Sequence, residues 1–163
     1  MKSDINVTDF LKKVFSYNVE SVKAVPPREI EGYGLCPYML CMGFGKTGND
    51  KNFRVKYSLH IQTKWRLSSA SGDIIVADDD LFEAAYNNRK GFFYKMWKWY
   101  KENLPMSICD FMLCNFMDLS VDFSNGDTLE IFNDTSEETE IWRIVPDEGK
   151  QLVVCGNGRT AFL

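Results

Sequence analysis

The residues of this chain that could serve as nucleophiles or bases are few, and their spacing favours no catalytic mechanism. A Ser or Cys nucleophile needs a base beside it, and His60 is the only histidine in the chain. His60 shares the polar face of a predicted strand with Arg54 and Lys56, two cations that lower its affinity for a proton. Carboxylates are plentiful, but none has a spacing that predicts a general acid–base pair. We therefore expect an exposed strand histidine and no catalytic residue.

The five cysteines of the chain raise the question of a metal site. Cys36 and Cys41, and likewise Cys109 and Cys114, have a C-x4-C spacing that could hold zinc. Both pairs fall in predicted strands, where an odd step sends the two sulfurs to opposite faces. Because only one histidine could complete a site, we predict no metal and no cofactor. Small, buried and reduced thiols are the expected alternative.

A short glycine-rich segment, residues 43–47 (Gly-Phe-Gly-Lys-Thr), invites comparison with a phosphate-binding P-loop. That motif requires a glycine five residues before its last one, where this chain has Leu40. A P-loop also opens a helix, so that backbone N–H groups meet the phosphates. This segment instead belongs to a strand pattern, and we predict no nucleotide site.

Composition and charge narrow the classes of partner. No apolar run approaches the roughly 20 residues of a membrane span, and the first residues lack the apolar stretch of a signal peptide. We therefore expect a cytoplasmic protein without membrane contacts. Residues 1–77 carry 11 basic and 7 acidic groups, whereas residues 78–163 carry 8 and 16. This balance disfavours nucleic acid, which needs clustered cations, and suits either a basic partner or a merely well-solvated surface.

The periodicity of the chain indicates two helices and many strands. A short amphipathic helix, capped by Thr8, is predicted to end near Asn18. Residues 38–44 predict a strand buried on both faces, and residues 54–62 alternate between apolar and polar side chains, as a half-buried strand does. Residues 92–104 predict a second helix, stopped by a proline. The apolar face of this helix comprises Phe93, Met96, Trp97, Tyr100 and Leu104.

A Trp-Arg hairpin occurs twice. Residues 65–76 align without a gap with residues 142–153, so that Trp65, Arg66 and Gly72 recur as Trp142, Arg143 and Gly149. At the same offset, the strand pair around Asn125-Gly126, a strong hairpin signal, places Leu119 on Met42 and Val121 on Phe44. The chain therefore predicts an α+β fold, mainly antiparallel β-sheet, in a single domain of residues 1–163. Two related four-strand units, about residues 38–77 and 115–154, follow a short N-terminal helix and flank a helical insert, about residues 78–105.

Three segments together resemble a known family. They are residues 60–67 (HIQTKWRL), residues 119–131 with the Asn-Gly hairpin, and residues 140–144 (EIWRI) followed by Leu-Val-Val. The family consists of small, mostly uncharacterised bacterial proteins, some of which resemble the immunity proteins of toxin–immunity systems. The resemblance covers about residues 38–158. It assigns no functional residue, because the shared motifs are structural.

The leading interpretation is a non-enzymatic cytoplasmic binding protein, most concretely an immunity protein that neutralises a cognate bacterial toxin by protein–protein contact. Its acidic second half would capture a basic partner, since complementary potentials speed association. The predicted partner-facing residues are the densest acidic clusters, Asp78, Asp79, Asp80, Glu137, Glu138 and Glu140.

Three other interpretations stay open. Arg66 and Arg143 would grip a small anion in a pocket between the units of a ligand-binding module, although core tryptophans with outward arginines would explain both hairpins equally. Phe92 and Trp99, on the lysine side of the second helix, would form an aromatic and cationic partner surface. A structural subunit would use its sheet edges to oligomerise.

Overall fold

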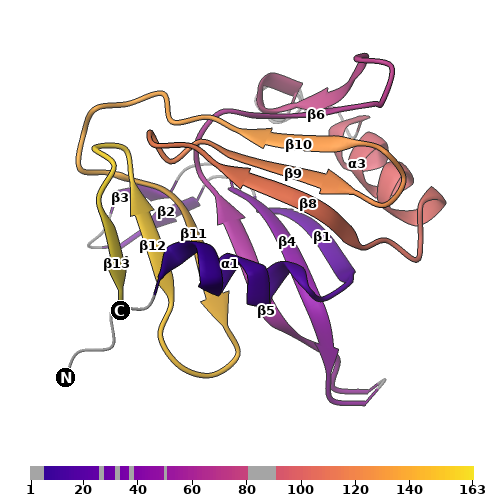
Figure 1. Ribbon diagram of the computed structural model, residues 1–163, viewed down its shortest axis with the longest axis horizontal. Helices are drawn as coiled ribbons and strands as arrows, with labels where there is room; N and C mark the ends of the chain where they lie inside the picture. The colour runs from indigo at the N-terminus through magenta and orange to yellow at the C-terminus, as the bar shows by residue number, and fades with distance from the viewer. Residues whose placement is uncertain (1–5, 26–27, 32–33, 37–38, 50, 81–90) are drawn as a thin grey trace.

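The computed structural model describes residues 6–25, 28–31, 34–36, 39–49, 51–80 and 91–163. Figure 1 shows the chain as a two-sheet structure with few helices. In chain order the elements are α1 (Val7–Phe15), β1 (Val19–Val25), β2 (Arg28–Ile30), β3 (Gly34–Cys36), β4 (Met39–Thr47), β5 (Arg54–Ile61), β6 (Trp65–Ser68), β7 (Ile74–Ala77), α3 (Gly91–Glu102), β8 (Ile108–Leu113), β9 (Leu119–Phe123), β10 (Thr128–Ile131), β11 (Glu140–Pro146), β12 (Leu152–Cys155) and β13 (Thr160–Phe162).

Both large sheets are antiparallel throughout. The six-stranded sheet has the order β1-β4-β5-β11-β12-β13, and the five-stranded sheet has the order β7-β6-β10-β9-β8. Strands β2 and β3, which lie between β1 and β4 in the chain, form a separate two-stranded hairpin. The predicted α+β class with mainly antiparallel sheet is therefore confirmed.

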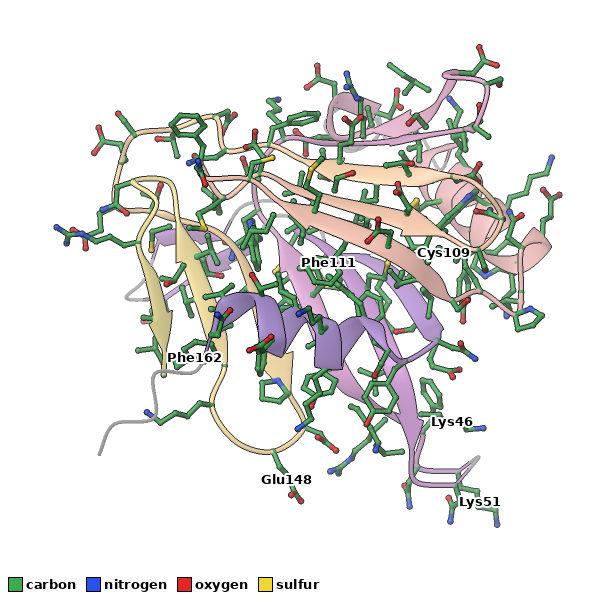
Figure 2. All side chains as sticks on the ribbon, in the orientation of Figure 1. Lys46, Lys51, Cys109, Phe111, Glu148 and Phe162 are labelled. Atoms are coloured by element: carbon green, nitrogen blue, oxygen red, sulfur yellow. The ribbon has the colours of Figure 1, made fainter. Side chains whose placement is uncertain are left out.

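The core lies between the two sheets and beneath α1. Alternate side chains of the strands are buried, as in β9, where Leu119, Val121 and Phe123 are at most 2% exposed. Phe15 of α1 packs edge-on against Phe44 and Phe111, with ring centroids 5.3 and 5.2 Å apart. Figure 2 shows Phe111 between β8 and α1. One apolar cluster thus joins both sheets and the first helix.

The N-terminal helix begins earlier than predicted. Asn6, not Thr8, is its N-cap, because the Asn6 side chain accepts the backbone N–H groups of Thr8 at 2.8 Å and Asp9 at 3.4 Å. Asn is among the best N-cap residues, and its position leaves Thr8 inside the first turn. Leu11, Val14 and Phe15 form the buried face.

The buried face of α3 also differs from the prediction. Met96 and Trp99 are 3% and 5% exposed, whereas Trp97 is 55% exposed. Positions 96 and 99 are three residues apart and share one helix face. The Trp99 ring packs edge-on against Phe123 at 5.1 Å, and its Nε1–H donates to Asp127 at 2.6 Å. This partly buried hydrogen bond lets the indole of Trp99 face inward, whereas Trp97, which was predicted to lie on the apolar face, is exposed.

The strand patterns around both Trp-Arg hairpins are confirmed. Trp65 and Trp142 are 2% and 0% exposed, whereas Arg66 is exposed and Arg143 half-buried. Adjacent residues of a strand point to opposite faces, so each tryptophan points into the core and the arginine next to it points away from the core. The hairpin β6-β7 belongs to the five-stranded sheet and β11-β12 to the six-stranded sheet.

Candidate functional site

Three loops meet at one end of the molecule, at the upper left of Figure 1. They connect β8 to β9, β10 to β11 and β12 to β13. Asn133 holds them together: its Nδ2 donates to the backbone oxygens of Phe116 at 2.9 Å and Gly156 at 2.6 Å. Its Oδ1 accepts the Thr135 N–H at 3.3 Å, and its own N–H donates to Asp118 at 2.6 Å. We call these three segments the loop cluster.

Gly156 allows two of these loops to approach closely. A Cβ atom at Gly156 would lie 2.4 Å from Thr135 Cγ2 and 2.9 Å from the Glu137 oxygen. Real Cβ atoms do not tolerate such distances, and a backbone oxygen cannot swing away as a side chain does. The Gly156 N–H also donates to the Thr139 oxygen at 2.9 Å. The acidic loop between β10 and β11 is thereby fixed against the β12-β13 turn.

The loop cluster encloses an open hollow of about 680 Å³. Its walls are mostly small and polar, and Phe116 stands on the rim with 76% of its surface exposed. An exposed aromatic side chain on a polar, ordered rim has the character of an anchor in protein interfaces. The hollow is lined by Asn115, Phe116, Asn133, Asp134, Thr135, Ser136, Gly156, Asn157 and Gly158.

The first predicted acidic cluster, Asp78 to Asp80, lies near Asp134, a residue that lines this hollow. Lys64 Nζ lies 3.1 Å from Asp78 and 2.9 Å from Asp79. Burial raises the pKa of Asp78; the Lys64 ammonium opposes the rise, and the carboxylates of Asp79 and Asp134 add to it. Asp80 accepts a backbone N–H of its own turn at 2.9 Å. The first cluster therefore meets the acidic loop at Asp134, with Lys64 neutralising part of the charge.

The acidic residues of the second cluster differ in how far they are paired. Arg159 Nη1 lies 2.9 Å from Glu138, and Arg143 Nε lies 3.3 Å from Glu140. Glu137 is exposed and has no ion pair within the described part of the chain. Exposed ion pairs contribute little to stability, but they reduce the charge that a partner meets. Glu137 is thus the member of this cluster most open to a partner.

The two arginines of the ligand-module interpretation are not brought together. Arg66 pairs with Glu130 at 2.5 Å and lies over the Phe132 ring, 5.0 Å from its centroid. Arg143 belongs to the other sheet and contacts Glu140 and His60. Each guanidinium already has a carboxylate partner, so these arginines do not define a shared anion pocket.

His60 is half-buried rather than exposed as predicted, and it is the cross-strand neighbour of Cys41, so this pair is a candidate for nucleophilic chemistry. Burial and the nearby Arg143 lower the pKa of His60, whose Nδ1 lies 3.3 Å from Arg143 Nε. Burial raises the pKa of Cys41 to about 11, despite the opposing charges of Arg143 and Lys23. A thiol becomes nucleophilic when its pKa falls. The environment of Cys41 acts in the opposite direction.

The cysteines are less buried than predicted. Cys41 and Cys155 are half-buried, and Cys109 and Cys114 are exposed. The argument that each pair lies on one strand fails for both pairs, because Cys36 and Cys41 lie on different strands, β3 and β4, and Cys114 follows the end of β8. The described residues contain no group of three or more His, Cys, Asp or Glu placed to hold a metal ion. Neither described helix has the length and apolar character that crossing a membrane requires.

The aromatic surface predicted on the second helix is also corrected. Trp99 is buried and hydrogen-bonded, so it cannot meet a partner without unfolding of α3. The side chain of Phe92 lies outside the described residues. Trp97 is the exposed tryptophan of α3, with Lys101 Nζ 5.9 Å from its ring centroid.

Comparison of the chain with protein-family models, curated proteins and solved structures found no match. The resemblance to immunity proteins therefore stays a prediction. The loop cluster was not predicted from sequence: Asn133, Phe116 and Gly156 are far apart in the chain, and Asn133 bonds to backbone oxygens, which leave no sequence signal. Glycines at positions 156 and 158 are a turn signal that the predictions above did not include.

Proposed function

We propose that this protein is a non-enzymatic, cytoplasmic binding protein that captures a basic protein partner at the loop cluster. In its most concrete form it is an immunity protein that neutralises a cognate bacterial toxin. The observation that carries the proposal is the Asn133 network, which fixes three loops around one hollow. Loops fixed before binding lose little conformational entropy on association.

The chemistry of the loop cluster favours a basic partner. Asp134 and Glu137 are exposed, and Asp79 has 84% of its side chain exposed. Exposed carboxylates accelerate the encounter with a basic protein and discriminate against acidic ones. Phe116 supplies an aromatic side chain that a partner can bury. Charge would thus set the association rate, and Phe116 the lifetime of the complex.

Charge reversal at Glu137 tests this proposal. The binding partner in the assay is a toxin encoded by a neighbouring gene. Glu137→Lys should slow association about three- to tenfold at low salt, and the effect should shrink as salt rises. Stopped-flow mixing at several ionic strengths measures both. Stability should change by no more than about 0.5 kcal/mol, since the side chain is exposed.

Glu148→Lys is the matched control for this charge reversal. Glu148 is exposed in the loop between β11 and β12, at the lower edge of Figure 2 and away from the loop cluster. The control makes the same change in net charge and should leave the association rate nearly unchanged. Equal slowing in both variants would mean that only net charge matters, and the loop cluster would no longer be the binding site.

We also propose that the scaffold is built from two copies of one unit. The strand orders β1-β4-β5-β11-β12 and β8-β9-β10-β6-β7 correspond strand by strand, with α1 and α3 preceding each first strand. The register supports this correspondence, because β1-β4 and β8-β9 shift at matching points, after Val19↔Phe44 and after Ile108↔Phe123. Each copy gives its last hairpin to the sheet of the other.

This correspondence changes the sequence alignment between the two copies. Leu40, paired with Ile61, corresponds to Leu119, paired with Ile131, rather than Leu119 corresponding to Met42. Between these isoleucines and the Trp-Arg hairpins, the second copy has the acidic loop, which is longer than the matching segment of the first copy. The acidic loop is one of the three segments of the loop cluster, so part of the proposed binding site lies outside the repeated scaffold.

An experimental structure can test the duplication. The rotation that carries Leu40 and Phe44 onto Leu119 and Phe123 should exchange Trp65 and Trp142, since the last hairpins are swapped between the sheets. A rotation that superposed β1, β4 and β5 on β8, β9 and β10 but did not superpose the hairpins β6-β7 and β11-β12 on each other would refute the duplication. Chance similarity of two hairpins predicts no such exchange.

A further inference from the structure

A second hollow, of about 380 Å³, lies on the face of the six-stranded sheet opposite α1. Its floor is one cross-strand row, in which Ser21 pairs with Gly43, Gly43 with Ser58, and Ser58 with Val145. These are small side chains, so the backbone of β4 is approached closely at this point. A Cβ atom at Gly43 would lie 2.3 Å from Ser21 Oγ and 2.6 Å from Val55 Cγ1.

Two hydroxyl groups in this floor lack partners. Ser21 and Ser58 are half-buried, and neither side chain has a hydrogen-bond partner among the described residues. A hydroxyl can donate one hydrogen bond and accept others, and partly buried polar groups are normally satisfied by protein or solvent. Two such groups on either side of a glycine can donate to one ligand.

The charge around this hollow is mainly positive. Lys23 lines it from β1 and Arg54 from β5, and both are exposed without an ion pair in the described part of the chain. Arg143, in the neighbouring row, is paired with Glu140 and adds little to this charge. Asp147 is the one carboxylate among the lining residues. Cations that no carboxylate neutralises favour a negatively charged ligand.

The row of the five-stranded sheet that corresponds under the proposed duplication is acidic. Asp110 pairs with Asp122, and Asp122 with Thr128, at the places that Ser21, Gly43 and Ser58 occupy in the other sheet. There the Thr128 hydroxyl donates to Asp122 at 2.7 Å, so both groups are satisfied within the sheet. The two sheets thus have the same strand order but differ in this row. In the described part of the chain, the six-stranded sheet has small, unpaired side chains here, and the five-stranded sheet has paired acidic ones.

We propose that this hollow binds a small organic anion, with its phosphate or carboxylate between Lys23 and the two serine hydroxyls. Phe53 and Pro146 offer apolar surface at the wall, which suits a ligand with an aromatic or aliphatic body. The site lies on a different sheet face from the loop cluster, and the proposal does not depend on a protein partner. It also differs from the pocket expected between Arg66 and Arg143.

The test uses the full-length protein, labelled with 15N, and three probes. Phenyl phosphate and benzoate carry the two anionic groups, and benzyl alcohol is the neutral control. At least one anion should produce saturable shifts of the backbone amides of Ser21, Cys41 and Ser58, and the tighter anion identifies the group. Benzyl alcohol should produce none. Absence of saturation with both anions, shifts confined to other surfaces, or equal shifts with benzyl alcohol would overturn the proposal.

Variants locate the anion within the hollow. Lys23→Gln should weaken binding of the tighter anion at least about tenfold, since it removes a charge-assisted hydrogen bond. Lys13→Gln, on the exposed face of α1, makes the same change in charge and should leave affinity unchanged. Both lysines are exposed, so both variants should fold. Equal affinity in the wild type and the Lys23→Gln variant would refute the assignment.

Discussion

Replacing Trp142 with alanine should lower the free energy of unfolding by about 3–5 kcal/mol, the usual range for a fully buried aromatic residue. Trp142 has no exposed surface and lies in the central part of the six-stranded sheet. Its Nε1–H also donates to the backbone oxygen of Met117 at 3.0 Å. The substitution therefore leaves both a cavity and an unsatisfied carbonyl. Urea unfolding, followed by far-UV circular dichroism, measures the loss.

The indole of Trp142 also connects the core to the loop cluster. Met117 has a φ of 65°, which is uncommon for a residue other than glycine. The hydrogen bond from Trp142 to the Met117 oxygen is one of the contacts that hold this turn. Phe116, on the rim of the hollow, is the residue directly before Met117. Trp142→Phe keeps an aromatic ring but removes the donor, so it should lose less stability than Trp142→Ala. A loss below about 1 kcal/mol in the alanine variant would contradict the packing described for this core.

The strands were predictable where burial alternates strictly. In β5, β9 and β10 every second side chain is apolar, and the structure buries those residues with the exception of Val55. The Asn125-Gly126 turn between β9 and β10 was predictable as well, since Gly126 has a φ of 91°. Local chemistry determines these elements, so no knowledge of distant residues is needed.

Helix faces and sheet membership were harder to predict for a physical reason. Trp97 and Trp99 are equally apolar, and only Asp127 and Phe123, from another part of the chain, decide which of them is buried. The sheet to which each Trp-Arg hairpin belongs is decided by long-range pairing. A single alignment offset could not reveal it, because the connecting loops differ in length.

The acidic character of the site was predictable, but its pairing was not. Composition identified Asp78, Asp79 and the acidic loop, and the structure places Asp78 near Asp134. Sequence gave no sign that Lys64 lies between the carboxylates of the first cluster. Cations from distant parts of the chain therefore determine which of the predicted acids a partner can meet.

Asn133→Ala should lower the free energy of unfolding by about 2–3 kcal/mol, because it leaves two backbone oxygens without their donor. The oxygens belong to Phe116 and Gly156, which come from different loops. Hydrogen exchange should quicken at the Gly156 amide, whose bond to Thr139 depends on the loops staying together. Asn115→Ala, on the same rim and exposed, is the control and should cost no more than about 0.5 kcal/mol.

Asn133→Asp separates the hydrogen-bond donor from the shape of the side chain. The variant is almost isosteric, but it turns a carboxylate toward the two oxygens that Nδ2 now serves. It should be less stable than Asn133→Ala at neutral pH, because repulsion is added to the lost bonds. Unlike the alanine variant, it should recover stability relative to wild type as pH falls, since a protonated carboxyl can donate again. A partner that bound the Asp and Ala variants as fast and as tightly as wild type would show that binding does not require the fixed loops.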